Sequence, residues 1–316
     1  MGVDCRELFR KTTVVIPTLN EAEAIGRVLD EVISAGIPKE NILVVDGGST
    51  DGTREIAASK GVKVIVQEGK GKAMAIKTAL RFVRTPYVLF MDGDYTYPAA
   101  HICDLVKKLE EEYDFVIGRR QWNSSSQGLI YRLGNWALTK LFNTLFGSSL
   151  GDVLSGMYAA RTDVLREVSF EMSHFSVESE IVAHMVNTGK KVTEIPIRYR
   201  KRLGEKKLGL LHGFGIAKDM FRLTWRYNPA TLIFSLGALL LFPGLALGAY
   251  VAYNLLFEGV KYYFKGLLAV LLTTTGMISL LLAIMTVYMK RVEIRTQIKL
   301  EEIRREIRNI TEKGHQ

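Results

Sequence analysis

The chain has 316 residues, two cysteines, five histidines and a formal net charge of +9. This length accommodates two domains, or one domain with an appendage. Cys5 and Cys103 indicate no disulfide framework, which suits a reducing cytoplasm. Neither the cysteines nor the histidines have ligand spacing, so a metal centre built from these residues is not expected.

Short apolar runs alternate with amphipathic segments along the first part of the chain. Four of these runs predict strands: 12–17, 42–46, 62–67 and 87–92. The segments between and after them have helical spacing of their apolar residues: 20–36, 53–61, 72–83 and 99–112. Alternating strands and helices predict an α/β fold with a doubly wound, mainly parallel sheet.

Aspartates stand where two of these strands end. Asp46 closes the second run, and Asp92 closes the fourth and is followed by Asp94. Ligands of doubly wound sheets lie beyond the carboxyl ends of the strands. Two carboxylates with open positions suit Mg²⁺ or Mn²⁺, which binds few protein groups and leaves room for phosphates. The sequence therefore predicts that Asp92 and Asp94 hold a metal ion that grips a nucleotide diphosphate.

The glycine-rich turns do not match the common nucleotide-binding motifs. No G-x-G-x-x-G follows the first strand, and no G-x-x-x-x-G-K-[ST] occurs. The segment "GKGKA" (69–73) is too loose to identify as a phosphate loop. A dinucleotide-dependent dehydrogenase and a P-loop ATPase are therefore disfavoured.

Two long uncharged runs occupy the C-terminal third. Residues 230–257 and 266–289 carry no charged side chain, and each exceeds the roughly 20 residues needed to cross a bilayer. Basic residues cluster before the first run and after the second, so the positive-inside rule places both ends in the cytoplasm. The sequence predicts a multi-pass protein of the cell membrane with a cytoplasmic catalytic domain, whose positive charge meets membrane lipids rather than nucleic acid.

Six motifs resemble family 2 glycosyltransferases of the GT-A fold, and among them the dolichyl-phosphate hexose synthases. The similarity extends over about 12–208, and includes archaeal enzymes that load the first N-glycan sugar onto dolichyl phosphate. The motifs are "VVIPTLNE" (14–21), "VVDGGSTDGT" (44–53), "MDGDYTYP" (91–98), "VIGRR" (116–120), "DVLSGMYAAR" (152–161) and "EIPIRYRKR" (194–202).

The resemblance implies roles for individual residues. Pro17, Asn20 and Glu21 would line the nucleotide pocket, Asp46 would bind the base, and Asp92 would bind both donor and metal. In the related mannose synthases the metal motif usually carries glutamine where this chain has a threonine, at position 96, so a third metal contact from that position is not implied.

The basic residues of the motifs point to the phosphates. Arg120 and Arg132 match arginines that meet phosphate, and Arg200 and Arg202 match a basic loop that closes over donor and acceptor. Asp152 is the carboxylate we expect near the acceptor, as an orienting group or weak base.

The implied reaction is an inverting transfer of a hexose from a nucleotide diphosphate sugar to dolichyl or polyprenyl phosphate, which yields a lipid-linked monosaccharide for protein glycosylation. A UDP-sugar carrying glucose or N-acetylglucosamine is favoured, and GDP-mannose is the alternative. The acceptor phosphate is mostly dianionic at neutral pH because its second pKa is about 6, so no strong base is needed. Arginines that hold two phosphates together would supply much of the catalysis.

Two other functions remain as alternatives. A processive polysaccharide synthase typically has more spans and a Q-x-x-R-W motif, which this chain lacks. A non-catalytic membrane partner would have no need of a metal at a diphosphate site. The sequence leaves open whether the chain forms a homo-oligomer.

Five segments are expected from these patterns. An N-terminal tail (1–11) precedes the glycosyltransferase domain (12–205), and an amphipathic segment (206–229) follows it along the inner leaflet. Two transmembrane helices (230–289) and a cytoplasmic C-terminal helix (290–316) complete the chain. Glu178 and Glu180 open a helical stretch and could either touch substrate or only favour its positive N-terminus.

Overall fold

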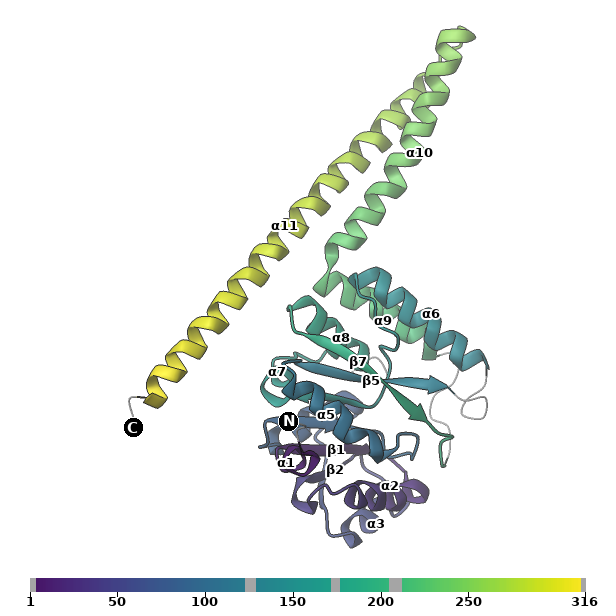
Figure 1. The fold of residues 1–316 in the computed structure, drawn as a ribbon. Coiled ribbons are helices and arrows are strands. Elements are labelled where there is room, and N and C mark those ends of the chain that lie inside the picture. Colours follow the sequence, from purple (N-terminus) through teal and green to yellow (C-terminus); the bar gives the residue numbers. More distant parts are fainter. Residues whose placement is uncertain (1–3, 123–128, 172–176, 205–211, 314–316) are drawn as a thin grey trace. The chain divides into compact units, whose positions relative to one another are not determined.

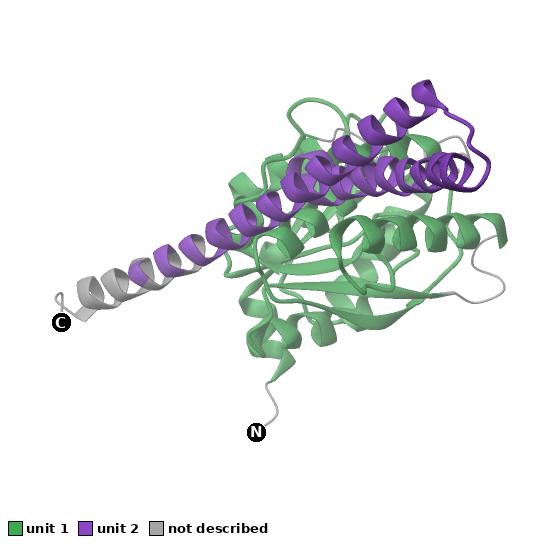
Figure 2. Cartoon of the chain, turned by 90° about the horizontal axis from the view of Figure 1, so that it is seen from above, with its two compact units in different colours: residues 1–223 green, residues 224–316 purple. Residues whose placement is uncertain are grey.

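The computed structural model describes residues 4–122, 129–171, 177–204 and 212–313. The chain divides into two compact units, Met1–Leu223 and Thr224–Gln316, which are coloured separately in Figure 2. Figure 1 shows the sheet and its helices in the first unit and two long helices in the second.

The first unit is built on a seven-stranded mixed sheet with the order β3-β2-β1-β4-β6-β5-β7. β1, β2, β3 and β4 are mutually parallel, and β6 runs antiparallel to both of its neighbours, β4 and β5. The predicted α/β fold with a mainly parallel sheet is confirmed. The strands are β1 (Thr12–Thr18), β2 (Ile42–Asp46), β3 (Lys63–Val66), β4 (Tyr87–Phe90), β5 (Phe115–Trp122), β6 (Tyr158–Arg161) and β7 (Val192–Tyr199).

Helices cover both faces of the sheet. One core cluster joins α1, α2 and α5 to alternate strand residues such as Val14, Ile16 and Leu89, as the two-residue period of a strand requires. α4 contacts β1 and β2, and its buried Ile76 and Ala79 lie outside that cluster, so α4 covers the other face. The α-helices described wholly within this unit are α1 (Cys5–Arg10), α2 (Ala22–Ser34), α3 (Thr53–Ser59), α4 (Lys72–Phe82), α5 (Ile102–Glu110), α6 (Leu129–Phe146), α7 (Thr162–Arg166) and α8 (Val177–Asn187).

A disulfide joins α1 to α5, between Cys5 and Cys103. The expectation of no disulfide is therefore wrong. The two cysteines are 98 residues apart, so their spacing carries no signal. They meet because Leu8 and Phe9 of α1 are buried in the same core cluster as Ile102 of α5.

The second unit contains α10 (Pro229–Phe257) and α11 (Tyr263–Lys313), which pack side by side (Figure 1). Both are long and apolar enough to cross a membrane, and most of their apolar surface is exposed. Gly244 and Gly276 let the backbones approach closely, because a Cβ at Gly276 would lie 2.6 Å from the backbone nitrogen of Leu241. Small residues at such contacts are typical of membrane helix pairs.

Two details differ from the expected C-terminal segments. α11 continues without interruption past residue 289, where we expected the second span to end and a separate helix to begin. The amphipathic segment is represented by α9 (His212–Tyr227), which exposes Phe214 and Phe221 and buries Met220. The part of that expected segment at 206–211 lies outside the described residues.

Candidate active site

The loops after β1, β2 and β4 lie together at one edge of the sheet, because these strands are parallel neighbours. Thr18 at the end of β1 pairs with Asp46 at the end of β2. The first loop carries Asn20 and Glu21, and the loop after β4 carries Asp92 and Asp94. The structure therefore gathers the expected nucleotide-binding and metal-binding residues at the carboxyl end of the sheet, where doubly wound folds bind ligands.

Hydrogen bonds join the first two loops to each other. The side-chain oxygen of Asn20 accepts a hydrogen bond from the backbone N–H of Thr50 at 2.9 Å. The backbone N–H of Glu21 donates to the hydroxyl of Thr53 at 2.9 Å. These contacts hold Glu21 at the start of α2, and its side chain is only 8% exposed. Pro17, which is also expected in the nucleotide pocket, lies half-buried near the end of β1.

Asp46 is fully buried and organises its own turn. One carboxylate oxygen accepts the backbone N–H groups of Gly48 and Ser49 at 2.9 and 2.8 Å. The other accepts the hydroxyl of Ser49. Gly48 has a φ of +94°, a conformation that glycine adopts without strain. Asp46 thus shapes the loop that the nucleotide would meet.

Asp92 and Asp94 are each paired with a cation from a different part of the chain. The ammonium of Lys72 lies 2.6 Å from Asp92, and the guanidinium of Arg202 lies 3.0 Å from Asp94. Asp94 also accepts the backbone N–H of Thr96 at 3.1 Å. Burial and the nearby charge of Asp92 raise the pKa of Asp94, and Arg202 opposes this shift.

Gly156 of the motif "DVLSGMYAAR" (152–161) makes room for Asp92. A Cβ at Gly156 would lie 2.1 Å from the Asp92 carboxylate, so any larger residue would displace it. The backbone N–H of Gly156 donates to the hydroxyl of Tyr97 at 2.8 Å. The glycine is thereby explained by the close approach of the turn before β6 to the loop that carries Asp92.

The two arginines of the loop after β7 face different partners. Arg202 bridges Asp94 and Glu21, with 2.5 Å to the Glu21 carboxylate. Arg200 makes two hydrogen bonds of 2.7 Å to Glu31 of α2 and lies over the ring of Tyr95. The bond to Arg200 lowers the pKa of Glu31. Arg202 therefore links Asp94 to Glu21, and Arg200 attaches the loop to α2.

Arg120 and Asp152 form a buried pair. Arg120 donates to the two Asp152 oxygens at 2.6 and 2.7 Å and to Asn135 of α6 at 2.8 Å. The side chains of Arg120 and Asp152 are 10% and 1% exposed. Arg132 lies half-buried on α6, one turn before Asn135, and makes no ion pair with another described residue.

Two residues of this site were not assigned by the sequence analysis. Lys72 opens α4 and also lies 2.5 Å from Glu178 of α8, so it links Asp92 to Glu178. Burial raises the pKa of Glu178, and Lys72 opposes the shift. The sequence left Glu178 open, and "GKGKA" carried too little pattern to single out Lys72.

Asp92 and Asp94 have the donor chemistry that a divalent ion needs. No group of three or more His, Cys, Asp or Glu side chains suited to a metal occurs within the described ranges. A divalent ion would thus rely on these two carboxylates and take its other ligands from phosphate and water. Mg²⁺ and Mn²⁺ commonly bind in this way at phosphate sites.

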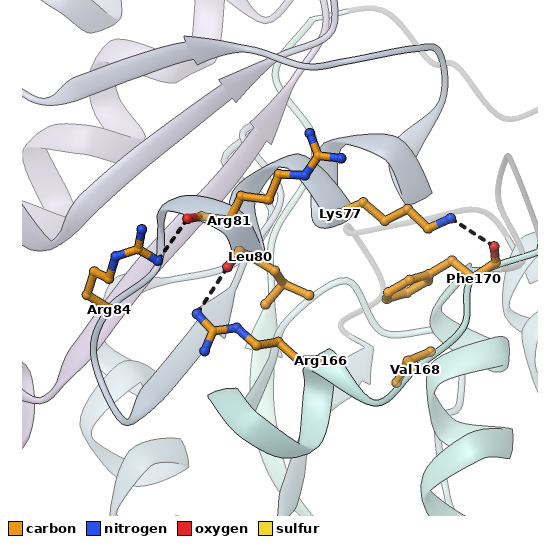
Figure 3. Close-up of a pocket in the computed structure, with 7 residues that line it drawn as sticks. All are labelled: Lys77, Leu80, Arg81, Arg84, Arg166, Val168 and Phe170. Atoms are coloured by element: carbon orange, nitrogen blue, oxygen red, sulfur yellow. Dashed lines mark hydrogen bonds between the residues drawn. The ribbon is translucent and has the colours of Figure 1, made fainter.

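A separate pocket of about 510 Å³ lies against α4 and α7 (Figure 3). Arg166 donates to the backbone carbonyls of Leu80 and Val83, and Lys77 donates to that of Phe170. Arg166 thus stabilises the carboxyl end of α4, where cations are favoured, and Lys77 attaches α4 to the segment after α7. None of the expected site residues lines this pocket.

Comparison with known proteins identifies the family. The sequence pattern described as Glycosyl transferase family 2 matches residues 13–169. Glycosyltransferase AglJ of Haloferax volcanii is 33% identical over 255 residues, which is 79% of this chain and 84% of that protein. The chain belongs to glycosyl transferase family 2. This confirms the family that the six motifs indicated.

Other family 2 relatives and solved structures agree with this assignment. The dolichyl-phosphate hexose transferase of Haloferax volcanii is 32% identical over 201 residues, 63% of this chain and 87% of that protein. Glucosyl-3-phosphoglycerate synthase of Mycobacterium tuberculosis, crystallised with Mn²⁺, UDP-glucose and phosphoglyceric acid, superimposes with a TM-score of 0.57 at 22% identity. The superposition covers 72% of this chain and 84% of the synthase chain. It supports the GT-A fold of this family 2 glycosyltransferase.

Proposed function

We propose that this glycosyltransferase transfers a hexose from a nucleotide diphosphate sugar to a polyprenyl phosphate such as dolichyl phosphate, with Mg²⁺ or Mn²⁺ held by Asp92 and Asp94. A phosphate oxygen of the lipid attacks the anomeric carbon, the bond from that carbon to the diphosphate breaks, and the nucleoside diphosphate leaves. Attack opposite the leaving group inverts the configuration.

The observation that carries the proposal is the position of Arg202. Its guanidinium bridges Asp94 of the proposed metal site and Glu21 of the proposed nucleotide pocket. Donor and acceptor phosphates repel each other as they approach, and a fixed guanidinium beside them reduces that repulsion. When bound, the divalent ion would supply positive charge to the leaving diphosphate.

The remaining residues position groups rather than exchange protons. The acceptor phosphate is mostly dianionic above its second pKa of about 6, so it can attack without a strong base. Asp152 uses both carboxylate oxygens to hold Arg120, which supports an orienting role over that of a base. Arg132 has no ion-pair partner among the described residues, which favours a contact between its guanidinium and phosphate.

Two kinds of comparison support the choice of donor and acceptor. A relative is named for transfer of hexose to dolichyl phosphate, and a GT-A neighbour was crystallised with UDP-glucose. We therefore favour UDP-glucose or UDP-N-acetylglucosamine over GDP-mannose. Two apolar helices suited to a membrane support a lipid acceptor, and the flanking basic residues favour a cytoplasmic active site.

The test uses the purified full-length protein in detergent with dolichyl phosphate and one radiolabelled donor at a time. We expect label in the lipid phase with a UDP-hexose, loss of transfer in EDTA, and recovery with Mn²⁺. Asp94→Asn should abolish transfer because it removes a metal-binding charge. Asp30→Asn is the matched control, since Asp30 lies on α2, is exposed and pairs with Lys60. Full activity in EDTA would refute the metal assignment, and transfer from GDP-mannose alone would refute the donor.

A further inference from the structure

Each proposed metal ligand shares a cation with a glutamate from another part of the fold. Arg202 links Asp94 to Glu21, and Lys72 links Asp92 to Glu178. The second bridge has no assigned role in the proposed reaction.

Lys72 contacts both of its carboxylates closely and is well shielded from solvent. Its ammonium lies 2.6 Å from an Asp92 oxygen and 2.5 Å from a Glu178 oxygen, and its side chain is 22% exposed. The two carboxylate oxygens are therefore no more than about 5 Å apart. Glu178 is 8% exposed in its side chain, so its charge needs a partner.

A divalent ion on Asp92 would compete with this ammonium. Two cations on one carboxylate repel each other, and the repulsion is weakly screened where water is scarce. Glu178 offers the ammonium a second partner when the metal takes Asp92. Lysine suits such a transfer because its ammonium is a compact charge on a flexible stem.

We propose that Lys72 is a resident counter-ion that occupies Asp92 in the metal-free protein and moves fully to Glu178 when the divalent ion binds. Lys72 and Glu178 are then positioning residues that set the affinity of the site for its metal in opposite directions. The inference rests on the proposed metal site at Asp92 and Asp94.

This competition can be tested by titrating the full-length protein with Mn²⁺ alone. The free Mn²⁺ at each step is measured by electron paramagnetic resonance. Lys72→Met should tighten Mn²⁺ binding about tenfold, which corresponds to one charge-assisted hydrogen bond that no longer opposes the metal. Glu178→Gln should weaken binding by a similar factor, because Lys72 then has Asp92 as its remaining partner. Lys72→Arg, which keeps the charge, should not tighten it.

Two controls distinguish competition for Asp92 from a general electrostatic effect. Lys77→Met removes the same charge from the same helix, but Lys77 contacts the carbonyl of Phe170 in the pocket of Figure 3, so Mn²⁺ affinity should not change. In the double variant, Glu178→Gln should have little effect once Lys72 is methionine, because there is no ammonium left to relocate. Additive effects would refute the transfer of Lys72 between its partners.

Thermal melts with and without Mn²⁺ distinguish a change in metal competition from a general loss of stability. Lys72→Met should melt at a lower temperature than wild type without metal, and Mn²⁺ should raise its melting temperature by more than it raises that of wild type. A lower melting temperature with unchanged Mn²⁺ affinity would show that the bridge is only structural. That result would overturn the inference and leave the proposed function standing, whereas no Mn²⁺ binding by either wild type or Lys72→Met would overturn both.

Discussion

Arg202 provides the sharpest test of the proposed mechanism. Its two terminal nitrogens contact two carboxylates, Asp94 at 3.0 Å and Glu21 at 2.5 Å. Lysine keeps the charge at this position but has no planar fork, so Arg202→Lys should retain at most part of this bridge. If one transition-state contact worth about 1.4–2.7 kcal/mol is lost, turnover falls about 10–100-fold.

Arg202→Ala should have a larger effect on turnover and should also reduce stability. Asp94 and Glu21 are 9% and 8% exposed in their side chains, so removing Arg202 leaves two nearly buried carboxylates without this partner. Arg202 itself is 22% exposed, which places the cost towards the lower end of the usual range, at about 1–3 kcal/mol. In a unit of this size that corresponds to a melting temperature about 2–12 °C lower.

The assay is the initial rate of radiolabel transfer to dolichyl phosphate, with donor binding measured separately by calorimetry. Arg202→Lys should bind donor nearly as wild type does while its kcat falls. Arg198→Ala is the matched control, because Arg198 is an exposed arginine of β7, the strand that leads into the loop of Arg202. If Arg202→Ala turns over normally and only dissociates more readily from anionic vesicles, then Arg202 is a headgroup anchor and the mechanism is wrong.

Two further predictions concern stability. Cys5→Ser should lower the melting temperature by about 4–16 °C, which corresponds to the about 2–4 kcal/mol that a disulfide typically contributes; dithiothreitol should lower wild type to the same value, and no effect of the reductant would refute the cross-link. His101 accepts the backbone N–H of Arg198 at 3.1 Å, and burial lowers its pKa. The unfolded chain therefore binds this proton more readily, so the contribution of His101 is present above about pH 6.5 and is lost as the pH falls below it. The melting temperature of wild type should drop more between pH 7.5 and 5.5 than that of His101→Gln, and parallel drops would exclude His101 as the cause.

Local patterns in the sequence determined the fold class and the place of the candidate site. Buried strands and the helices between them follow from apolar spacing, which depends on neighbouring residues along the chain. Parallel strands end at a common edge, so the strand pattern alone predicts that Asp46, Asp92 and Asp94 lie at the same edge of the sheet. The two apolar helices follow from an uncharged run longer than a bilayer requires.

Only the tertiary structure decided which side chains pair. Glu178 reaches Lys72 because α8 and the start of α4 meet beside Asp92, and Arg202 reaches Glu21 from 181 residues away. The disulfide between Cys5 and Cys103 likewise depends on the packing of α1 on α5. Such contacts leave no local period in the sequence, because they are set by the geometry of whole elements rather than by the residues beside them.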